Sequence, residues 1–248
     1  RNTLIDCRDA LAEGAKTALP VGIACAVVGI VIGTLTLTGI ASTIGQVIIS
    51  VGKSSIFLSL VLTMIISLIL GMGIPTIPNY IITSAVAGPA LLELGVPLIV
   101  SHMFVFYFGI LADLTPPVAL ACFAAAPIAK EKGLKISIEA VKIAMAGFVI
   151  PYMAVYSPAL MLQNVSGQSL DMFVISVLYI CLKVFIAIIL WGVAVIGYYK
   201  EKLSITERLF AIIIPALLIT ALPVSDEIGF SILAVFLFLR WLKIRKKK

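Results

Sequence analysis

The chain has 248 residues, of which 62% are hydrophobic and only 12% are charged, and its mean hydropathy is +1.20. A soluble domain carries roughly twice that share of charge, and apolar runs of about 20 residues recur here, so the composition predicts an all-α polytopic membrane protein. The net charge of +6 could suggest a nucleic-acid partner. We expect no nucleic-acid binding, because the basic residues lie at the ends of predicted helices, where they set membrane topology.

The N-terminal part of the chain contains a polar segment and the first predicted span. Residues 1–17 are polar and amphipathic, and we expect them to form a cytoplasmic lead-in. The apolar run 18–40 is long enough to cross a bilayer, and a short polar stretch follows it. Arg1 stands where an initiator methionine would, and no signal peptide precedes the first span, so we expect a truncated or processed part of a longer chain.

Residues 55–93 predict a re-entrant hairpin. The apolar segments on either side of the break Gly71–Asn79 are each too short to cross a bilayer comfortably. Pro75 and Pro78 each lack a backbone donor and clash with the preceding turn, so we expect both to stop a helix. In hydrocarbon, a freed backbone group must be satisfied by protein or by a water-filled cavity. Two half-length helices that meet at such a tip would enter and leave on one side of the membrane.

Residues 97–129 predict a broken helix, because their apolar run is interrupted at Asp113–Pro117. The two halves together are long enough to cross the bilayer once. A charged loop at 130–137 and a predicted span at 138–162 follow. Two such prolyl breaks are typical of the discontinuous helices that meet at a transporter's binding site.

Residues 170–248 predict a C-terminal extension of about three spans with a basic tail. The apolar runs are 171–199, 208–223 and 228–242. If the N-terminus is cytoplasmic, the basic loops and the C-terminus all fall on the cytoplasmic face, as the positive-inside rule requires. Two full crossings by 55–93 would give the same result, so the re-entrant hairpin is predicted from segment length alone.

The tip of the predicted hairpin offers oxygen ligands. Gly71 and Gly73 permit close backbone approach, and Thr76 and Asn79 add side-chain oxygens. Exposed carbonyls suit a hard cation such as sodium, and helix N-terminal amides suit a carboxylate. We predict ion binding at Gly71, Gly73, Pro75 and Thr76, and substrate binding at Thr76 and Asn79. The alternative is an ordinary loop between two short helices.

The second break carries an acid within an apolar run. Asp113 is the only acidic residue in the stretch 94–130. An ionisable group inside a membrane is costly and usually faces a cavity, a partner or an ion. We predict ion binding at Asp113 and Thr115, and substrate binding at Thr115, Pro116 and Pro117. In the alternative interpretation, Asp113 caps the helix that begins near Pro116.

Other polar residues in apolar runs give weaker signals. His102 fits a hydrogen-bonded packing residue better than a proton relay. Lys183 lies near the middle of a predicted span, and the sequence suggests no functional partner for it. The chain contains no zinc-protease, nucleophile-elbow or phosphate-loop motif, so we expect no enzymatic activity. An ion gradient or another subunit would have to drive transport.

Two long runs of sequence resemble the large membrane subunit of tripartite ATP-independent periplasmic (TRAP) transporters: LILGMGIPTIPNYIITSAVAGPALLELGVP and HMFVFYFGILADLTPPVALACFAAAPIA. The stretches ALPVGIACAVVGIVIGTLTLTGI and FVIPYMAVYSPALML are similar to fused permeases of the TAXI branch. The resemblance covers residues 10–163. Residues 170–248 resemble, less specifically, the C-terminal helical extension of fused members.

The resemblance implies a bacterial inner-membrane transporter that imports organic acids, often carboxylates, with a sodium gradient. An extracytoplasmic substrate-binding protein would deliver the substrate. The membrane subunit would contain two inverted repeats, each with a re-entrant hairpin and a broken helix, and would move as an elevator within membrane lipid. Residues 18–163 would be the second repeat, and an N-terminal half or small membrane subunit would be a partner. Sodium would be the coupling ion, and the resemblance implies no cofactor.

The sequence departs from the family pattern in two respects. The first repeat is absent from these residues, so the chain alone is not expected to transport. Dicarboxylate-branch members often carry an acid in the hairpin tip, whereas Ile74–Thr76 has none, which leaves the substrate open. A passive channel or a structural assembly subunit without its own ion site are the alternatives. Saturable, sodium-dependent uptake would argue against the channel.

Overall fold

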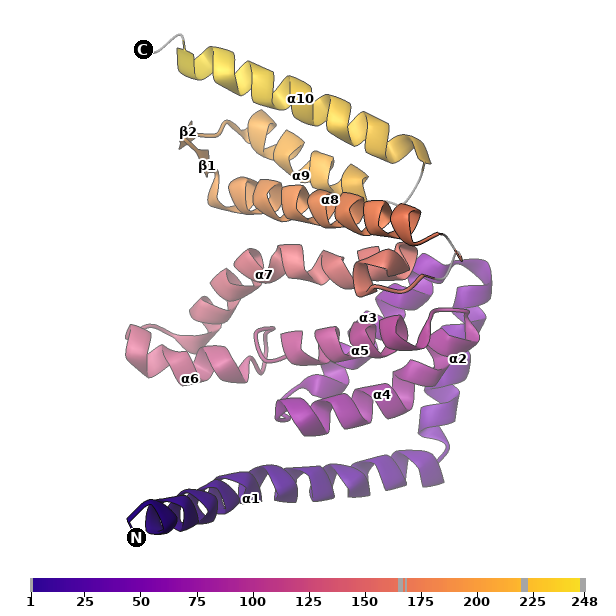
Figure 1. The fold of residues 1–248 in the computed structure, drawn as a ribbon, viewed down its shortest axis with the longest axis vertical. Coiled ribbons are helices and arrows are strands. Elements are labelled where there is room, and N and C mark those ends of the chain that lie inside the picture. Colours follow the sequence, from indigo (N-terminus) through magenta and orange to yellow (C-terminus); the bar gives the residue numbers. More distant parts are fainter. Residues whose placement is uncertain (1, 165–166, 168, 220–222, 246–248) are drawn as a thin grey trace. The chain divides into compact units, whose positions relative to one another are not determined.

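A computed structural model describes the chain except for residues 1, 165–166, 168, 220–222 and 246–248 (Figure 1). The described residues form ten α-helices and one 3₁₀ helix, with a single pair of two-residue strands. This confirms the predicted all-α class. The chain divides into two compact units. The first contains Arg1–Val96 with Val105–Ser137, and the second contains Pro97–Phe104 with Ile138–Lys248.

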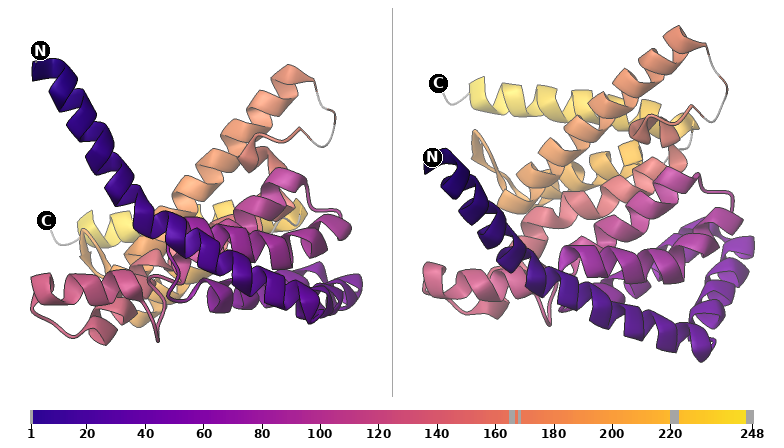
Figure 2. Two further views of the ribbon diagram at one scale, coloured as in Figure 1. Left: turned by 90° about the horizontal axis from the view of Figure 1, so that it is seen from below. Right: turned by 60° about the horizontal axis from the view of Figure 1, so that its bottom comes forward.

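The first unit begins with two long helices separated by a sharp bend. These are helix α1 (Asn2–Leu37) and helix α2 (Ile40–Ser54), whose change of direction Figure 2 shows. The segment Gly22–Leu37 of α1 and helix α2 are bent by 68° relative to each other. Gly39 permits the bend, because it adopts φ +72°, which side chains disfavour. Residues 2–17 of the predicted lead-in and residues 18–37 of the predicted first span therefore belong to one helix, and the polar stretch after the bend is helical too.

Helices α3 (Ile56–Gly71) and α4 (Thr76–Glu93) form the hairpin of the first unit. Both pack against α2, and the two helices also contact each other. One buried polar group on α3 is satisfied by α2: the Ser59 hydroxyl donates to the Ile48 carbonyl at 2.7 Å. On the other side of α4, Ile82 and Val86 form a core cluster with Val28 of α1. This packing fixes the hairpin against the N-terminal helices.

Three helices follow the hairpin. Helix α5 (Leu98–Leu111) ends at the second break, and its residues divide between the two units. Helix α6 (Leu120–Ala129) resumes after the break, and helix α7 (Gly133–Tyr156) begins after a short turn. Between α6 and α7, Lys130 adopts φ +52° at the helix end. The second half of the broken helix thus begins at Leu120, four residues later than expected from Pro116.

The second unit ends in three helices that lie side by side (Figure 1). A short 3₁₀ helix (Pro158–Met161) precedes them. They are α8 (Leu170–Ile196), α9 (Ile205–Ile219) and α10 (Pro223–Arg245). The strands β1 (Tyr198–Tyr199) and β2 (Glu201–Lys202) pair antiparallel between α8 and α9. The core of the three helices consists of Leu190, Ala194, Ala211, Ile214, Leu218 and Phe236.

Helix length and composition identify a smaller set of spans than the sequence predicted. In the described part of the chain, α7 and α8 are long and apolar enough to cross a membrane, and α1 with α2 could form a third, bent span. Helices α3, α5 and α6 are apolar but shorter than 18 residues. The re-entrant path of the hairpin and the crossings of α9 and α10 stay predictions.

Candidate functional site

One buried amide joins the hairpin to the end of α5. Asn79, in the first turn of α4, is 1% exposed, and its Nδ2 donates to the Gly109 carbonyl at 2.6 Å. The same nitrogen lies 3.5 Å from the Gly71 carbonyl, a weak contact. Because both neighbours are acceptors, the NH₂ side of the amide must face them. Asn79 therefore connects the end of α3, the start of α4 and the end of α5.

Two glycines make room for this amide. A Cβ at Gly109 would lie 2.5 Å from Asn79 Oδ1, and a Cβ at Gly71 would lie 2.6 Å from the Gly109 carbonyl oxygen. Neither distance is tolerated in a packed interior, so both positions require glycine. The sequence analysis identified Gly71 but missed Gly109. The only available signal was a glycine inside an apolar helical pattern, which is unfavourable unless packing demands it.

The hairpin tip is built by one glycine and two prolines. Gly73 adopts φ +77°, and the carbonyl of Pro75 accepts the Asn79 N–H at 3.0 Å. Pro78 lies inside the first turn of α4, where a backbone N–H would have no intrahelical acceptor. The expectation that Pro78 stops a helix is therefore wrong, because a proline at this position starts one.

At the second break the chain makes tight turns instead of continuing α5. The Asp113 N–H donates to the Ile110 carbonyl at 3.0 Å, and the Thr115 N–H and hydroxyl donate to the Leu111 carbonyl at 3.1 and 2.7 Å. The main-chain carbonyl of Asp113 accepts the Ala121 N–H at 3.2 Å. No side-chain cap bond is made at the start of α6. The alternative interpretation of Asp113 as the cap of that helix is wrong.

Polar oxygens at both breaks lack partners. Asn79 Oδ1 and Asp113 Oδ1 are buried, and neither has a hydrogen-bond partner among the residues that the structure describes. Within that same part of the chain, the carbonyls of Gly73 and Ile74 receive no backbone hydrogen bond. A buried oxygen without a partner costs about 1–3 kcal/mol. Such oxygens are available to a cation.

The two breaks are neighbours in the first unit. A Cβ on Gly73 would lie 3.7 Å from Val118 Cγ1, so the hairpin tip contacts the segment between α5 and α6. Tyr80 of α4 and Phe106 of α5 add an edge-to-face ring contact with centroids 5.4 Å apart. The predicted residues differ in burial: Gly71 and Asn79 are buried, Asp113, Thr115 and Pro116 are half-buried, and Gly73, Pro75, Thr76 and Pro117 are exposed.

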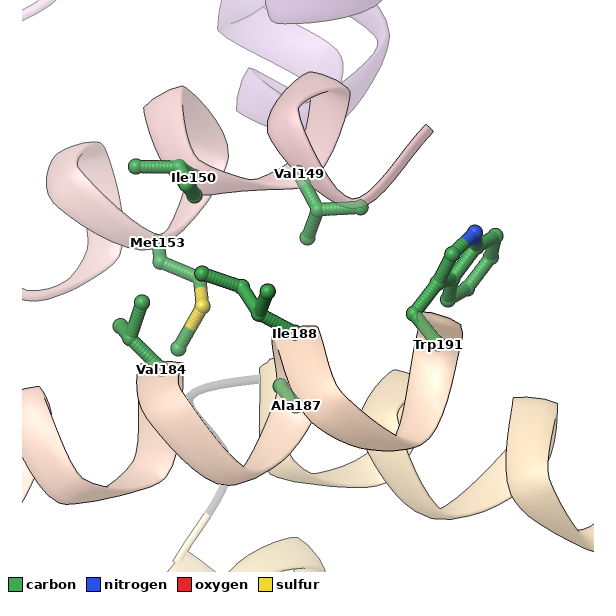
Figure 3. A pocket seen from close by; sticks show the side chains of 7 residues that line it. All are labelled: Val149, Ile150, Met153, Val184, Ala187, Ile188 and Trp191. Atoms are coloured by element: carbon green, nitrogen blue, oxygen red, sulfur yellow. The ribbon is translucent and has the colours of Figure 1, made fainter. Parts of the chain in front are cut away.

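Two cavities of the described chain lie away from these breaks. Figure 3 shows a pocket between α7 and α8, lined by Val149, Trp191 and five other side chains. Its volume is about 10 Å³, barely room for one water, so it is a packing defect. A larger groove of about 430 Å³ lies between α1, α2 and the C-terminal half of α4. It includes Gln46 and Glu93 but none of the predicted site residues.

The second unit contains a buried ion pair. Lys183 of α8 is 4% exposed, and its Nζ lies 2.7 Å from both carboxylate oxygens of Asp226 in the first turn of α10. The Tyr179 hydroxyl donates to the same carboxylate at 2.8 Å. Sequence reasoning found no partner for Lys183, because Asp226 lies 43 residues away in a different helix.

A second charged cluster lies where β1 and β2 meet α10. Arg240, 1% exposed, donates to the carbonyls of Tyr199 and Glu201 and to the Glu207 carboxylate. Burial raises the pKa of Glu207, but hydrogen bonds from Ser204 and Lys243 and the charge of Arg240 outweigh it and lower the pKa to about 2. In both clusters each buried charge has a partner of opposite charge, although Arg240 Nε has no hydrogen-bond partner among the described residues.

Comparison with protein families identifies a match over most of the chain. The family described as the tripartite ATP-independent periplasmic transporter, DctM component, matches residues 1–168. Comparisons with curated proteins and with solved structures gave no match. The matched region contains the hairpin, both breaks and the Asn79 contact, and it ends before α8.

Proposed function

Because the chain belongs to the DctM family of tripartite ATP-independent periplasmic transporter permeases, we propose that it is the permease part of a sodium-coupled, binding-protein-dependent importer of organic acids. Family membership makes it a transporter component of the membrane. Sodium coupling, the carboxylate substrate and the TAXI-type affiliation belong to the proposal.

The meeting of the two breaks at Asn79 is the observation that carries this proposal. At both breaks, backbone N–H and C=O groups lose the hydrogen bonds that a continuous helix would give them. In a membrane such groups are tolerated only where protein or a water-filled cavity satisfies them. The Asn79 amide satisfies part of it, through the Gly109 carbonyl. The oxygens that remain unsatisfied supply the chemistry for a cation.

For sodium, the proposed ligands are oxygens of Gly71, Gly73, Pro75, Thr76, Asp113 and Thr115. The unpartnered Asp113 Oδ1 supports this assignment, and so do the carbonyls near Gly73. The Thr115 hydroxyl donates a hydrogen bond to the Leu111 carbonyl oxygen, so the lone pairs of the hydroxyl oxygen can face a cation. A hard cation prefers oxygen ligands, and unwound carbonyls at helix breaks provide them in transporters.

For the substrate, the proposed contacts are Thr76, Asn79, Thr115, Pro116 and Pro117. Thr76 is exposed at the first position of α4, where N–H groups without intrahelical acceptors favour a carboxylate. Asn79 is buried, so it would act on the substrate by holding the tip in place. The hairpin tip itself carries no acid that would repel an anionic substrate.

The proposed partners are an extracytoplasmic substrate-binding protein and the rest of the permease, either an N-terminal half or a small membrane subunit. The family name implies a periplasmic component, and the inner membrane is the corresponding location. Both termini of the chain are proposed to be cytoplasmic, because the basic loops then obey the positive-inside rule.

Uptake into proteoliposomes tests the proposal. The complete permease and its binding protein are reconstituted, and radiolabelled organic acids are offered with and without an inward sodium gradient. We expect uptake that requires both sodium and the binding protein. Sodium-independent uptake would contradict the coupling, and uptake without the binding protein would contradict the tripartite mechanism.

A matched pair of threonine variants tests the ion ligands. Thr115→Ala removes a hydroxyl at the break, and we expect the sodium concentration for half-maximal uptake to rise about tenfold. Thr34→Ala is the control, because its hydroxyl makes the same contact to a carbonyl four residues earlier in α1 and Thr34 is not a proposed ligand. Equal sodium dependence in the two variants would remove Thr115 from the site.

A further inference from the structure

The second unit has an open apolar groove between α8 and α10. The groove has a volume of about 220 Å³. Its walls are branched aliphatic and aromatic side chains, and they include Tyr199 of β1, which follows the C-terminal end of α8. Ile189 and Leu237 on its walls are 46% and 42% exposed. Such a groove is costly to leave open to water, but it suits a hydrocarbon chain.

The Tyr199 end of the groove is strongly basic. Lys200 Nζ lies 6.0 Å from the centre of the Tyr199 ring, and Lys202 follows in β2. Figure 1 shows β1 and β2 at the same end of the unit as the C-terminal end of α10, which carries Lys243 and Arg245. The acids at this end are Glu201 and Glu207, and Glu207 is already paired with Arg240 and Lys243. The exposed lysines therefore create an excess of positive charge.

Aromatic side chains mark this end as a membrane interface. Trp241 and Tyr198 are 52% and 54% exposed, and Arg245 lies over the Trp241 ring at 5.1 Å. Tryptophan and tyrosine concentrate where headgroups meet hydrocarbon, and lysine and arginine at that depth attract anionic lipid. An apolar groove below the interface and cations at its mouth match the two ends of one phospholipid molecule.

We propose that this groove binds an anionic phospholipid, with an acyl chain between α8 and α10 and the phosphate beside Lys200 and Lys202. The buried Arg240 positions the mouth of the site, because it holds the carbonyls of Tyr199 and Glu201. The site lies outside the region that matches the transporter family, so it gives the C-terminal extension a role of its own.

Lipid binding by the purified permease tests this site. Native mass spectrometry of the protein with phosphatidylglycerol or phosphatidylcholine, matched in acyl chains, measures which lipid is retained. Lys200→Gln with Lys202→Gln should weaken phosphatidylglycerol binding about 30-fold, because each lysine near the surface contributes about fivefold. Lys130→Gln with Lys132→Gln is the control, since these exposed lysines lie on the other predicted cytoplasmic loop.

A second pair of variants tests the apolar part of the site. Ile189→Trp fills the groove and should lower retention of phosphatidylglycerol, whereas Ile175→Trp on an exposed face of α8 should not. Thermal unfolding in phosphatidylcholine checks that every variant is folded. Equal retention of the two lipids, an equal effect of the control lysines, or unchanged binding by Ile189→Trp would overturn the proposal.

Discussion

The two units of this chain stabilise buried polar groups by different means. In the first unit, the neutral amide of Asn79 connects the hairpin tip to the end of α5, and Asn79 Oδ1 and Asp113 Oδ1 have no hydrogen-bond partner among the described residues. In the second unit, the charges of Lys183 and Asp226 are paired with each other. If the first unit takes up and releases an ion, as proposed, it must keep some oxygens free of internal partners, whereas a purely structural region need not. Variants in each unit test that contrast.

The largest expected loss of stability comes from breaking the ion pair between Lys183 and Asp226. Lys183→Met would leave Asp226 as a poorly solvated charge without its partner, and we expect a loss of about 3 kcal/mol in the free energy of unfolding. Lys142→Met is the control, because its pair with Glu139 is exposed and contributes less than about 1 kcal/mol. Thermal unfolding of the purified permease measures both.

A double variant sharpens this prediction. Lys183→Met combined with Asp226→Leu removes both charges, so most of the lost stability should return. If the double variant is as unstable as Lys183→Met alone, the ion pair does not explain the effect. Sodium-driven uptake per folded protein should be unchanged in the double variant, because neither residue belongs to the proposed site.

Overpacking the Asn79 contact should have the next largest effect. Gly109→Ala places a Cβ 2.5 Å from Asn79 Oδ1, and we expect a loss of about 1–3 kcal/mol together with loss of uptake. Gly29→Ala in α1 is the control, since nothing lies within 4 Å of its added Cβ. Normal uptake by Gly109→Ala would show that the spacing of the two breaks is unimportant.

A smaller loss of stability is expected from a change at Thr83, one helical turn after Asn79. The buried Thr83 hydroxyl donates to the Asn79 carbonyl at 2.9 Å. Thr83→Val should cost about 1 kcal/mol of stability and leave the sodium dependence of uptake unaltered. A change in sodium dependence would extend the proposed site beyond the hairpin tip.

The smallest expected effect is on the pH dependence of thermal stability, to which Glu207 in the second unit contributes. The pKa of Glu207 is lowered to about 2 from its ordinary value of 4.5, so its ionised form stabilises the folded state above pH 4.5. This contribution is lost as the pH falls from 4.5 towards 2. Glu207→Gln should reduce the decline in thermal stability over that interval. An unchanged decline would assign it to other carboxylates.

Local sequence rules predicted the breaks but not how they are bridged. Proline and glycine in an apolar run interrupt a helix wherever they occur, so Gly71–Pro75 and the Pro116–Pro117 pair were identifiable. The start of α6 was misplaced, because tight turns after Asp113 delay the helix to Leu120. Pro78 was predicted to stop a helix, but it lies in the first turn of α4. Its role depends on where α4 begins, and the sequence around Pro78 did not reveal that position.

The sequence by itself determined the membrane class, the helical elements and the transporter resemblance, because these follow from composition and from residues close together in the chain. The tertiary structure decided the partners of buried polar groups: Gly109 for Asn79, 30 residues apart, and Asp226 for Lys183, 43 residues apart. A hydrogen bond or ion pair depends on atoms within about 3 Å, and only packing brings distant residues that close.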